Sequence, residues 1–120
     1  MCEHVVARAR EPFALGALWE VVEGMERFGL GGWGWGAAWT TAEGGLVAHR
    51  DPHSFREDPA TADLAAVETT SLLVHLRRPS RLGTVGLADT QPFLDPAGRF
   101  AFSHNGDLRE YHAMRRHYLE

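Results

Sequence analysis

The residue best suited to do chemistry in this sequence is its single cysteine, Cys2, which directly follows Met1. A starting methionine is usually removed when the second residue is small, and Cys2 would then be N-terminal. Its thiol would lie beside a free α-amine, which titrates near about 7.7–8.0 and can accept the thiol proton at neutral pH. While Met1 remains attached, that nitrogen is an amide and cannot act as a base. A lone cysteine is more often a small buried residue, so position alone leaves both interpretations open.

Two further segments carry groups that could bind a substrate or stabilise charge. Residues 75–80, His-Leu-Arg-Arg-Pro-Ser, follow the most strand-like stretch, and an arginine at a strand end can hold a carboxylate with two parallel hydrogen bonds. Residues 103–107, Ser-His-Asn-Gly-Asp, place the side-chain amide of Asn105 beside the backbone N–H of Gly106. Two such donors can converge on one oxygen, as an oxyanion hole requires. The ordinary alternatives are a surface arginine pair and a common Asn-Gly turn.

The order of these segments resembles the class II glutamine amidotransferases, and most of all their stand-alone branch, which begins Met-Cys and continues with a Gly-Trp-Gly strand. The resemblance runs from the first residue almost to the last, and the terminal cysteine with His-Asn-Gly is its specific part. The matching pieces are Met1-Cys2, Gly32-Trp33-Gly34 with Gly36, His75-Leu76-Arg77-Arg78, Gln91-Pro92-Phe93 and His104-Asn105-Gly106-Asp107-Leu108.

The resemblance implies a role for each matched residue. Cys2 would be the nucleophile with its own α-amine as general base, and Asn105 with Gly106 would form the oxyanion hole. Arg77 would hold the α-carboxylate of glutamine, and Ser80 and His104 would complete the substrate-binding set. The reaction would be attack on the side-chain amide of glutamine or a related γ-glutamyl amide, release of ammonia, and hydrolysis of a thioester, with no metal or cofactor.

The resemblance also implies an α+β fold, the N-terminal-nucleophile αββα sandwich of antiparallel sheets. Residues 1–120 would form a single partial domain whose C-terminal part is shortened or missing, because family domains continue well beyond His-Asn-Gly. The missing part carries further strands and an acidic residue for the substrate α-ammonium, so we expect weak or no glutaminase activity from this chain alone. Ser80 stands where the family usually has Thr, and Gln91 where it usually has His.

A catalytically silent relative that serves as a binding or assembly module is the alternative. A shortened sandwich leaves sheet edges and apolar faces uncovered, so we expect a homodimer or larger assembly in either case. A metal-binding protein is disfavoured, because His112 and His117 are five residues apart and do not share one face of a helix. The single cysteine excludes an internal disulfide and a Cys-rich zinc site.

Composition limits the class of protein. The chain has 120 residues, enough for one domain with a modest core. Its net charge is −4 and its Lys and Arg residues form no run, which disfavours a nucleic-acid-binding surface. No apolar stretch is long enough to cross a bilayer, and the charged residues of the N-terminal segment are incompatible with a signal peptide. We therefore expect a cytoplasmic protein without nucleic-acid or membrane partners.

The elements that must position these residues can be read from periodicity. Pro12 is expected to start a helix whose apolar positions recur at three- and four-residue spacing (Leu15, Leu18, Val22, Met25 and Phe28) and which ends at Gly29. A brief helix is expected at 62–67, and a last one capped by Asp107, with Leu108, Tyr111, Met114 and Tyr118 on one side. Strands are expected at 2–9, 35–41, 46–50, 69–76 and 100–104. Runs of strands with few helices and no strict alternation indicate α+β with an antiparallel sheet.

Overall fold

The computed structural model describes residues 1–80, 85–107 and 109–119. Its main sheet has four antiparallel strands in the order β1-β4-β2-β3, and a second sheet pairs β5 with β6. The strands are β1 (Glu3–Ala14), β2 (Trp35–Thr40), β3 (Leu46–Asp51), β4 (Glu68–Leu76), β5 (Phe93–Leu94) and β6 (Ala101–Phe102). The helices are α1 (Trp19–Phe28), α2 (Ala60–Leu64) and α3 (Tyr111–Leu119), with short 3-10 turns η1 (Leu15–Leu18), η2 (Phe55–Glu57) and η4 (Leu87–Asp89). The expected α+β class with antiparallel sheets is confirmed.

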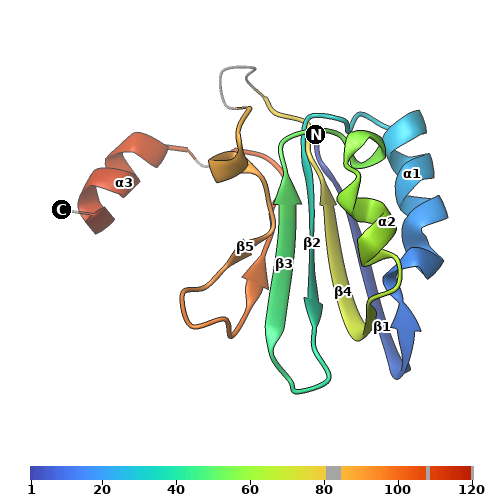
Figure 1. Ribbon diagram of the computed structural model, residues 1–120. Coiled ribbons are helices and arrows are strands. Elements are labelled where there is room, and N and C mark those ends of the chain that lie inside the picture. The colour runs from blue at the N-terminus through green and yellow to red at the C-terminus, as the bar shows by residue number, and fades with distance from the viewer. Residues whose placement is uncertain (81–84, 108, 120) are drawn as a thin grey trace.

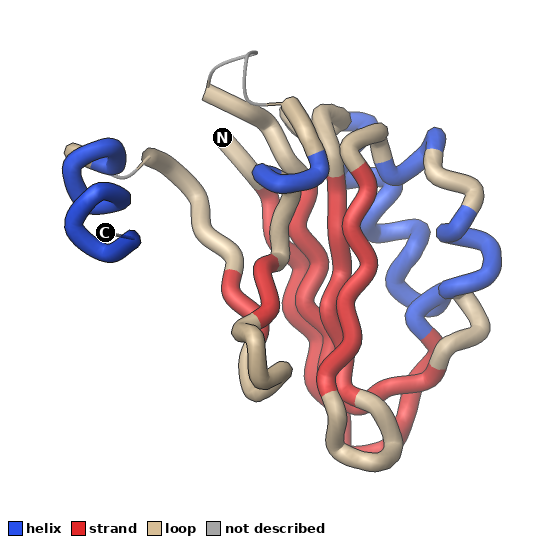
Figure 2. The backbone as a smooth tube through the Cα atoms, turned by 60° about the vertical axis from the view of Figure 1, so that its left-hand side comes forward, coloured by secondary structure: helices blue, strands red, loops and turns tan. Residues whose placement is uncertain are grey.

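The main sheet lies between two different layers. Helices α1 and α2 cover one of its faces, which we call the helix face, and the β5–β6 hairpin lies on the other, which we call the hairpin face (Figures 1 and 2). Alternate residues of the central strands point to the helix face and form the core with Leu15, Val22 and Phe55: these are Trp35, Ala37, Trp39, Leu72, Val74 and Leu76. Layers in the order helix, sheet, sheet are those expected of part of an αββα sandwich.

The first strand is longer than its sequence indicates, and the expected helix start at Pro12 is wrong. Strand β1 continues to Ala14, with its register shifted between Arg8 and Phe13. Because β1 is an edge strand, Pro12 can lie in it without removing a hydrogen bond from the ladder. The helix α1 begins only at Trp19 and ends before Gly29 as expected, although Phe28 is 87% exposed and lies off the apolar stripe.

The C-terminal elements also differ from expectation. Strand β6 is confined to Ala101–Phe102, and α3 begins at Tyr111, so Asp107 does not cap it; the Asp107 carboxylate accepts a hydrogen bond from Ser80 instead. Leu108, expected on the inner side of this helix, lies outside the described residues. Helix α3 stands apart from the sheets in both views (Figures 1 and 2).

The centre of the molecule follows the sequence closely. The β2–β3 hairpin is confirmed, and the stretch expected at 69–76 is β4, which lies between β1 and β2. The brief helix expected at 62–67 begins two residues earlier, at Ala60. Among the residues that the structure describes, no helix has both the length and the apolar character needed to span a membrane.

Candidate active site

The first strand brings Cys2 to the end of the central strand. Because β1 and β4 are antiparallel and Glu3 pairs with Leu76, Cys2 lies beside the residues that leave β4. The Cys2 Sγ is 3.4 Å from the Arg78 backbone N and 3.5 Å from the Arg78 carbonyl oxygen. The backbone of the His-Leu-Arg-Arg segment therefore holds the thiol in place, and Cys2 remains partly exposed.

Asn105 binds Cys2 through both ends of its side-chain amide. The Cys2 backbone N donates to Asn105 Oδ1 at 3.0 Å, and Asn105 Nδ2 donates to the Cys2 carbonyl oxygen at 3.0 Å. A backbone N–H can only donate and a carbonyl can only accept, so these two partners fix which end of the amide is oxygen. Two residues 103 positions apart in the chain are thus joined by a reciprocal pair of hydrogen bonds.

Gly106 and Asp107 continue this segment at the surface. Gly106 has a φ of +94°, a conformation that residues with a side chain rarely adopt, and it is exposed. The Ser80 Oγ donates to Asp107 Oδ1 at 2.8 Å. This bond ties the loop after β4 to the segment after Asn105, so the Ser80 hydroxyl proton is already engaged within the protein.

The Gln91 side chain holds the backbone of His104. The His104 backbone N donates to Gln91 Oε1 at 2.6 Å, and its ring stacks on Phe102 with centroids 5.8 Å apart. Gln91 is 5% exposed, and it sits between two other buried residues, Thr90 and Pro92. Residues 90–92, which we call the wedge, pack on the hairpin face of the main sheet.

Three histidines gather behind this segment. His4 and His75 are partners across β1 and β4, with ring centroids 4.9 Å apart, and His75 is fully buried. Burial lowers the pKa of His75 to about 4, and the positive charge of a protonated His4 adds to this effect. The pKa of His4 is also lowered, first by burial and then by His104. Both shifts favour the neutral form of His4 and His75.

Arg77 leaves β4 on the same face as His75 but is 7% exposed. Its backbone N donates to the Gly34 carbonyl at 2.8 Å, and its carbonyl accepts from Trp33 N at 3.2 Å. The Gly-Trp-Gly segment therefore lies against the Arg77 backbone. The guanidinium lies within the protein, whereas the neighbouring Arg78 is exposed.

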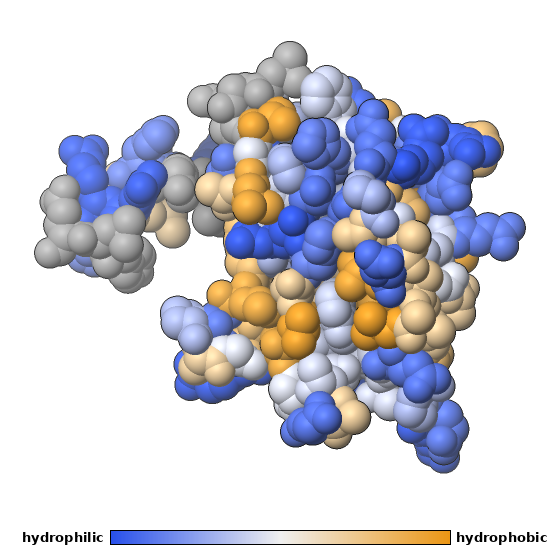
Figure 3. All heavy atoms as spheres, in the orientation of Figure 1, coloured by the Kyte–Doolittle hydropathy of each residue, from blue (hydrophilic) through white to orange (hydrophobic). Residues whose placement is uncertain are grey.

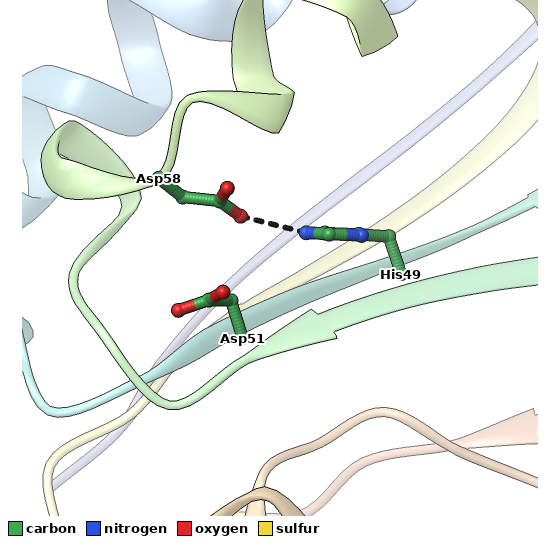
Figure 4. Close-up of side chains that lie close together, drawn as sticks. All are labelled: His49, Asp51 and Asp58. Atoms are coloured by element: carbon green, nitrogen blue, oxygen red, sulfur yellow. Dashed lines mark hydrogen bonds and ion pairs between the residues drawn. The ribbon is translucent and has the colours of Figure 1, made fainter.

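A possible metal-ligand group lies on the other side of the sheet. The described residues contain one set of three His, Cys, Asp or Glu side chains with ligand atoms within 4.8 Å of one another: His49, Asp51 and Asp58 (Figure 4). The buried Asp58 carboxylate accepts from His49 Nε2 at 2.6 Å, from Trp35 Nε1 at 3.0 Å and from the Ala60 N at 2.9 Å. Burial opposes its ionisation, but these donors outweigh burial and lower its pKa. This carboxylate is already satisfied, and it joins the start of α2 to β2 and β3.

Sequence reasoning missed several residues that build the Cys2 site. Gln91 was notable only as a departure from the family pattern, yet it supports His104. The contact between Cys2 and Arg78 runs through the backbone, so no side-chain type could have indicated it. His4 carried no signal of its own, although it lies two residues from Cys2 and pairs with a motif histidine.

A family model described as glutamine amidotransferases class-II matches residues 24–120, which include every motif residue except Met1 and Cys2. No curated protein matches the chain. The match extends over most of the chain and includes Arg77, Gln91, Asn105 and Gly106. The chain belongs to the class II glutamine amidotransferases.

Proposed function

We propose that this chain releases ammonia from glutamine, or from a related γ-glutamyl amide, with Cys2 as nucleophile. The observation that carries the proposal is the reciprocal pair of hydrogen bonds between Cys2 and Asn105. These residues stand at opposite ends of the chain, and an oxyanion donor must lie next to the nucleophile that it serves. Met1 is 76% exposed, so its removal would disturb no core contact.

The general base of the reaction would be the Cys2 nitrogen. Once Met1 is removed, this nitrogen becomes an α-amine that takes the thiol proton, and the thiolate attacks the amide carbon. Asn105 Nδ2 and the Gly106 N–H would stabilise the oxyanion of the tetrahedral intermediate. The intermediate collapses, the leaving nitrogen takes the proton back from the α-ammonium, and ammonia departs. Water then hydrolyses the γ-glutamyl thioester and restores the thiol.

The substrate-binding residues would act from the loops around this centre. Arg77 would pair with the α-carboxylate, and its burial would strengthen that pair by excluding water. Ser80 would act from the hydroxyl lone pairs that its bond to Asp107 leaves open. His104 would shape the wall of the pocket through the ring that stacks on Phe102.

The test is ammonia release from glutamine by protein that intact mass shows to lack Met1. We expect weak release, which disappears in Cys2→Ala and in protein that retains Met1. Cys2→Ser is the matched variant, because it keeps the shape of the side chain with a much weaker nucleophile. Turnover that survives Cys2→Ala would refute the proposed mechanism.

A second candidate function, assembly or binding, is favoured by the hairpin face. Apolar side chains gather where the hairpin meets the main sheet (Figure 3). Val6, Phe100 and Phe102 are each more than half exposed. A groove of about 290 Å³ runs between the sheet and the segment before β6, with Val6, Leu73 and Phe100 among its lining residues.

We propose that a second copy of the chain covers this face and that the assembly works in the cytoplasm. Covering exposed aliphatic and aromatic side chains yields roughly 25 cal/mol per Å² of apolar area. Sedimentation of the wild type and Phe100→Ser should show a dimer that the substitution weakens. A wild-type monomer at micromolar concentration would refute the dimer.

A further inference from the structure

The wedge links the middle of the main sheet to the segment that carries Asn105. At its base, Gly36 of β2 leaves room for the wedge, because a Cβ at this position would clash with the Gln91 carbonyl oxygen and lie 2.9 Å from Pro92 Cδ. Arg50 of β3 donates from Nη1 to the Thr90 carbonyl at 3.0 Å. The wedge is therefore fixed to two neighbouring strands by close packing and by a charge-assisted hydrogen bond.

The Gln91 side chain extends from the wedge to the His104 backbone. This side chain is almost fully buried, and its Oε1 accepts the His104 N–H at 2.6 Å. His104 directly precedes Asn105, so an anchor at the His104 nitrogen fixes where the next residue begins. The chain of contacts runs from Gly36 through Gln91 and His104 to Asn105, and from there to Cys2.

We propose that Gln91 is a positioning residue, whose side-chain carbonyl sets the main chain at His104 and so places Asn105 and Gly106 opposite Cys2. The inference rests on the proposed function. Gln91 acts through Asn105 and Gly106, whose donors lose their effect when they are displaced by about 1 Å. A side-chain oxygen is needed here because the segment around His104 is not part of a longer strand that could supply a backbone acceptor.

The substitutions separate the acceptor from the bulk of the side chain. Gln91→Met keeps a similar side-chain volume and removes the acceptor. Gln91→Glu keeps an oxygen at the same position and should behave like the wild type. Thr90→Val is the matched control, because it removes a partly buried hydrogen bond of the same wedge, from Thr90 Oγ1 to the Gly86 carbonyl at 2.8 Å, without touching His104. None of these residues touches the reacting atoms.

The first readout needs no activity. Backbone amide hydrogen exchange is measured by NMR in protein that retains Met1, where Cys2 N–H donates to Asn105 Oδ1. In Gln91→Met we expect exchange at His104 and at Cys2 to become about tenfold faster or more, since the amide at each position loses its fixed acceptor. In Gln91→Glu and Thr90→Val we expect both rates to stay within about threefold of wild type.

The second readout is glutamine hydrolysis by protein without Met1. We expect kcat in Gln91→Met to fall about tenfold or more while KM stays within about threefold, because the oxyanion donors act mainly in the transition state. Unchanged exchange at His104 and Cys2 in Gln91→Met would overturn the proposal, and so would an equal kcat loss in Thr90→Val. If the wild type releases no ammonia, the proposed function fails, but the exchange rates still decide whether Gln91 positions Asn105.

Discussion

The buried His75 ring should make the stability of this protein depend on pH in a way that one substitution removes. His75 is fully buried, and among the described residues neither ring nitrogen has a hydrogen-bond partner of good geometry, although the His104 backbone lies close enough to favour protonation slightly. Burial lowers its pKa from 6.5 to about 4, and the charges on His4, His104 and Arg77 act in the same direction.

The sign of this pH dependence follows from the number of protons that His75 binds in the folded and in the unfolded chain. Between about pH 4 and 6.5 the unfolded chain binds a proton at His75 that the folded chain does not, so the free energy of unfolding rises with pH in this window. The contribution is fully present above the unfolded pKa and is lost as the pH falls. With a pKa of 6.5 in the unfolded chain and about 4 in the folded one, the loss between pH 8 and pH 5 is about 2 kcal/mol.

The assay is urea unfolding of the wild type and His75→Leu at pH 8 and pH 5. Leucine removes the titrating group and the unpartnered nitrogens and keeps an apolar side chain, so we expect stability at pH 8 within about 1 kcal/mol of wild type. Between the two pH values, the wild type should lose about 2 kcal/mol more than the variant.

The control is His53→Gln, at a surface side chain that is 72% exposed. It should follow the wild type between the two pH values. The neighbouring His4 titrates with His75, so the two rings share the effect, and His4→Leu should remove a smaller part of it. Equal loss of stability in the wild type and His75→Leu would refute the reasoning.

Three other predictions concern single contacts. Asn105→Asp keeps the acceptor for the Cys2 nitrogen but removes the Nδ2 donor, so the rate of ammonia release should fall about 10²–10³-fold in steady-state assays; an unchanged rate would exclude Asn105 from the oxyanion hole. Gly36→Ala should lower stability to urea by about 1–3 kcal/mol through its clash with Gln91, whereas Gly24→Ala, with open space around it on α1, should raise stability by about 0.5–1 kcal/mol. In thermal melts, Asp58→Asn should lower the free energy of unfolding by about 1–3 kcal/mol because a buried acceptor is lost. Stabilisation of the wild type by Zn²⁺ in these melts would show that this group binds metal instead.

The sequence predicts best where one physical signal acts alone. The β2–β3 hairpin follows from two short stretches joined by a Gly-Gly turn, and β4 follows from the most strand-like stretch of the chain; both are where they were expected. Around Pro12 two signals compete: proline at a helix start and proline in an edge strand look the same without knowledge of the neighbouring strand. The pairing of Phe13 with Thr69 decides the outcome, and this contact is not local.

The candidate site shows the same division. Its side chains could be named because the motifs keep a recognisable order, but their support could not. Arg78 touches the thiol with backbone atoms, which every residue has, and Gln91 acts through an oxygen that many side chains could offer. The packing of the wedge on Gly36 and the bond to His104 distinguish this glutamine from an ordinary loop residue.

Hydrogen-bond counting at Asn105 constrains how the proposed chemistry can work. Its Nδ2 carries two hydrogens, and the Cys2 carbonyl takes one of them, so one remains for a substrate oxygen. A single donor is weak support for an oxyanion, so in the proposed mechanism the N–H of Gly106 would supply the second. The hydrogen bond from Asn105 Nδ2 to the Cys2 carbonyl also holds the plane of the amide against Cys2. After Met1 is removed, Asn105 Oδ1 would accept one hydrogen from the α-amine. That acceptor would orient the amine so that its lone pair faces away from Asn105 and is available to the thiol. One asparagine would thus align the base while it offers its remaining hydrogen to the transition state.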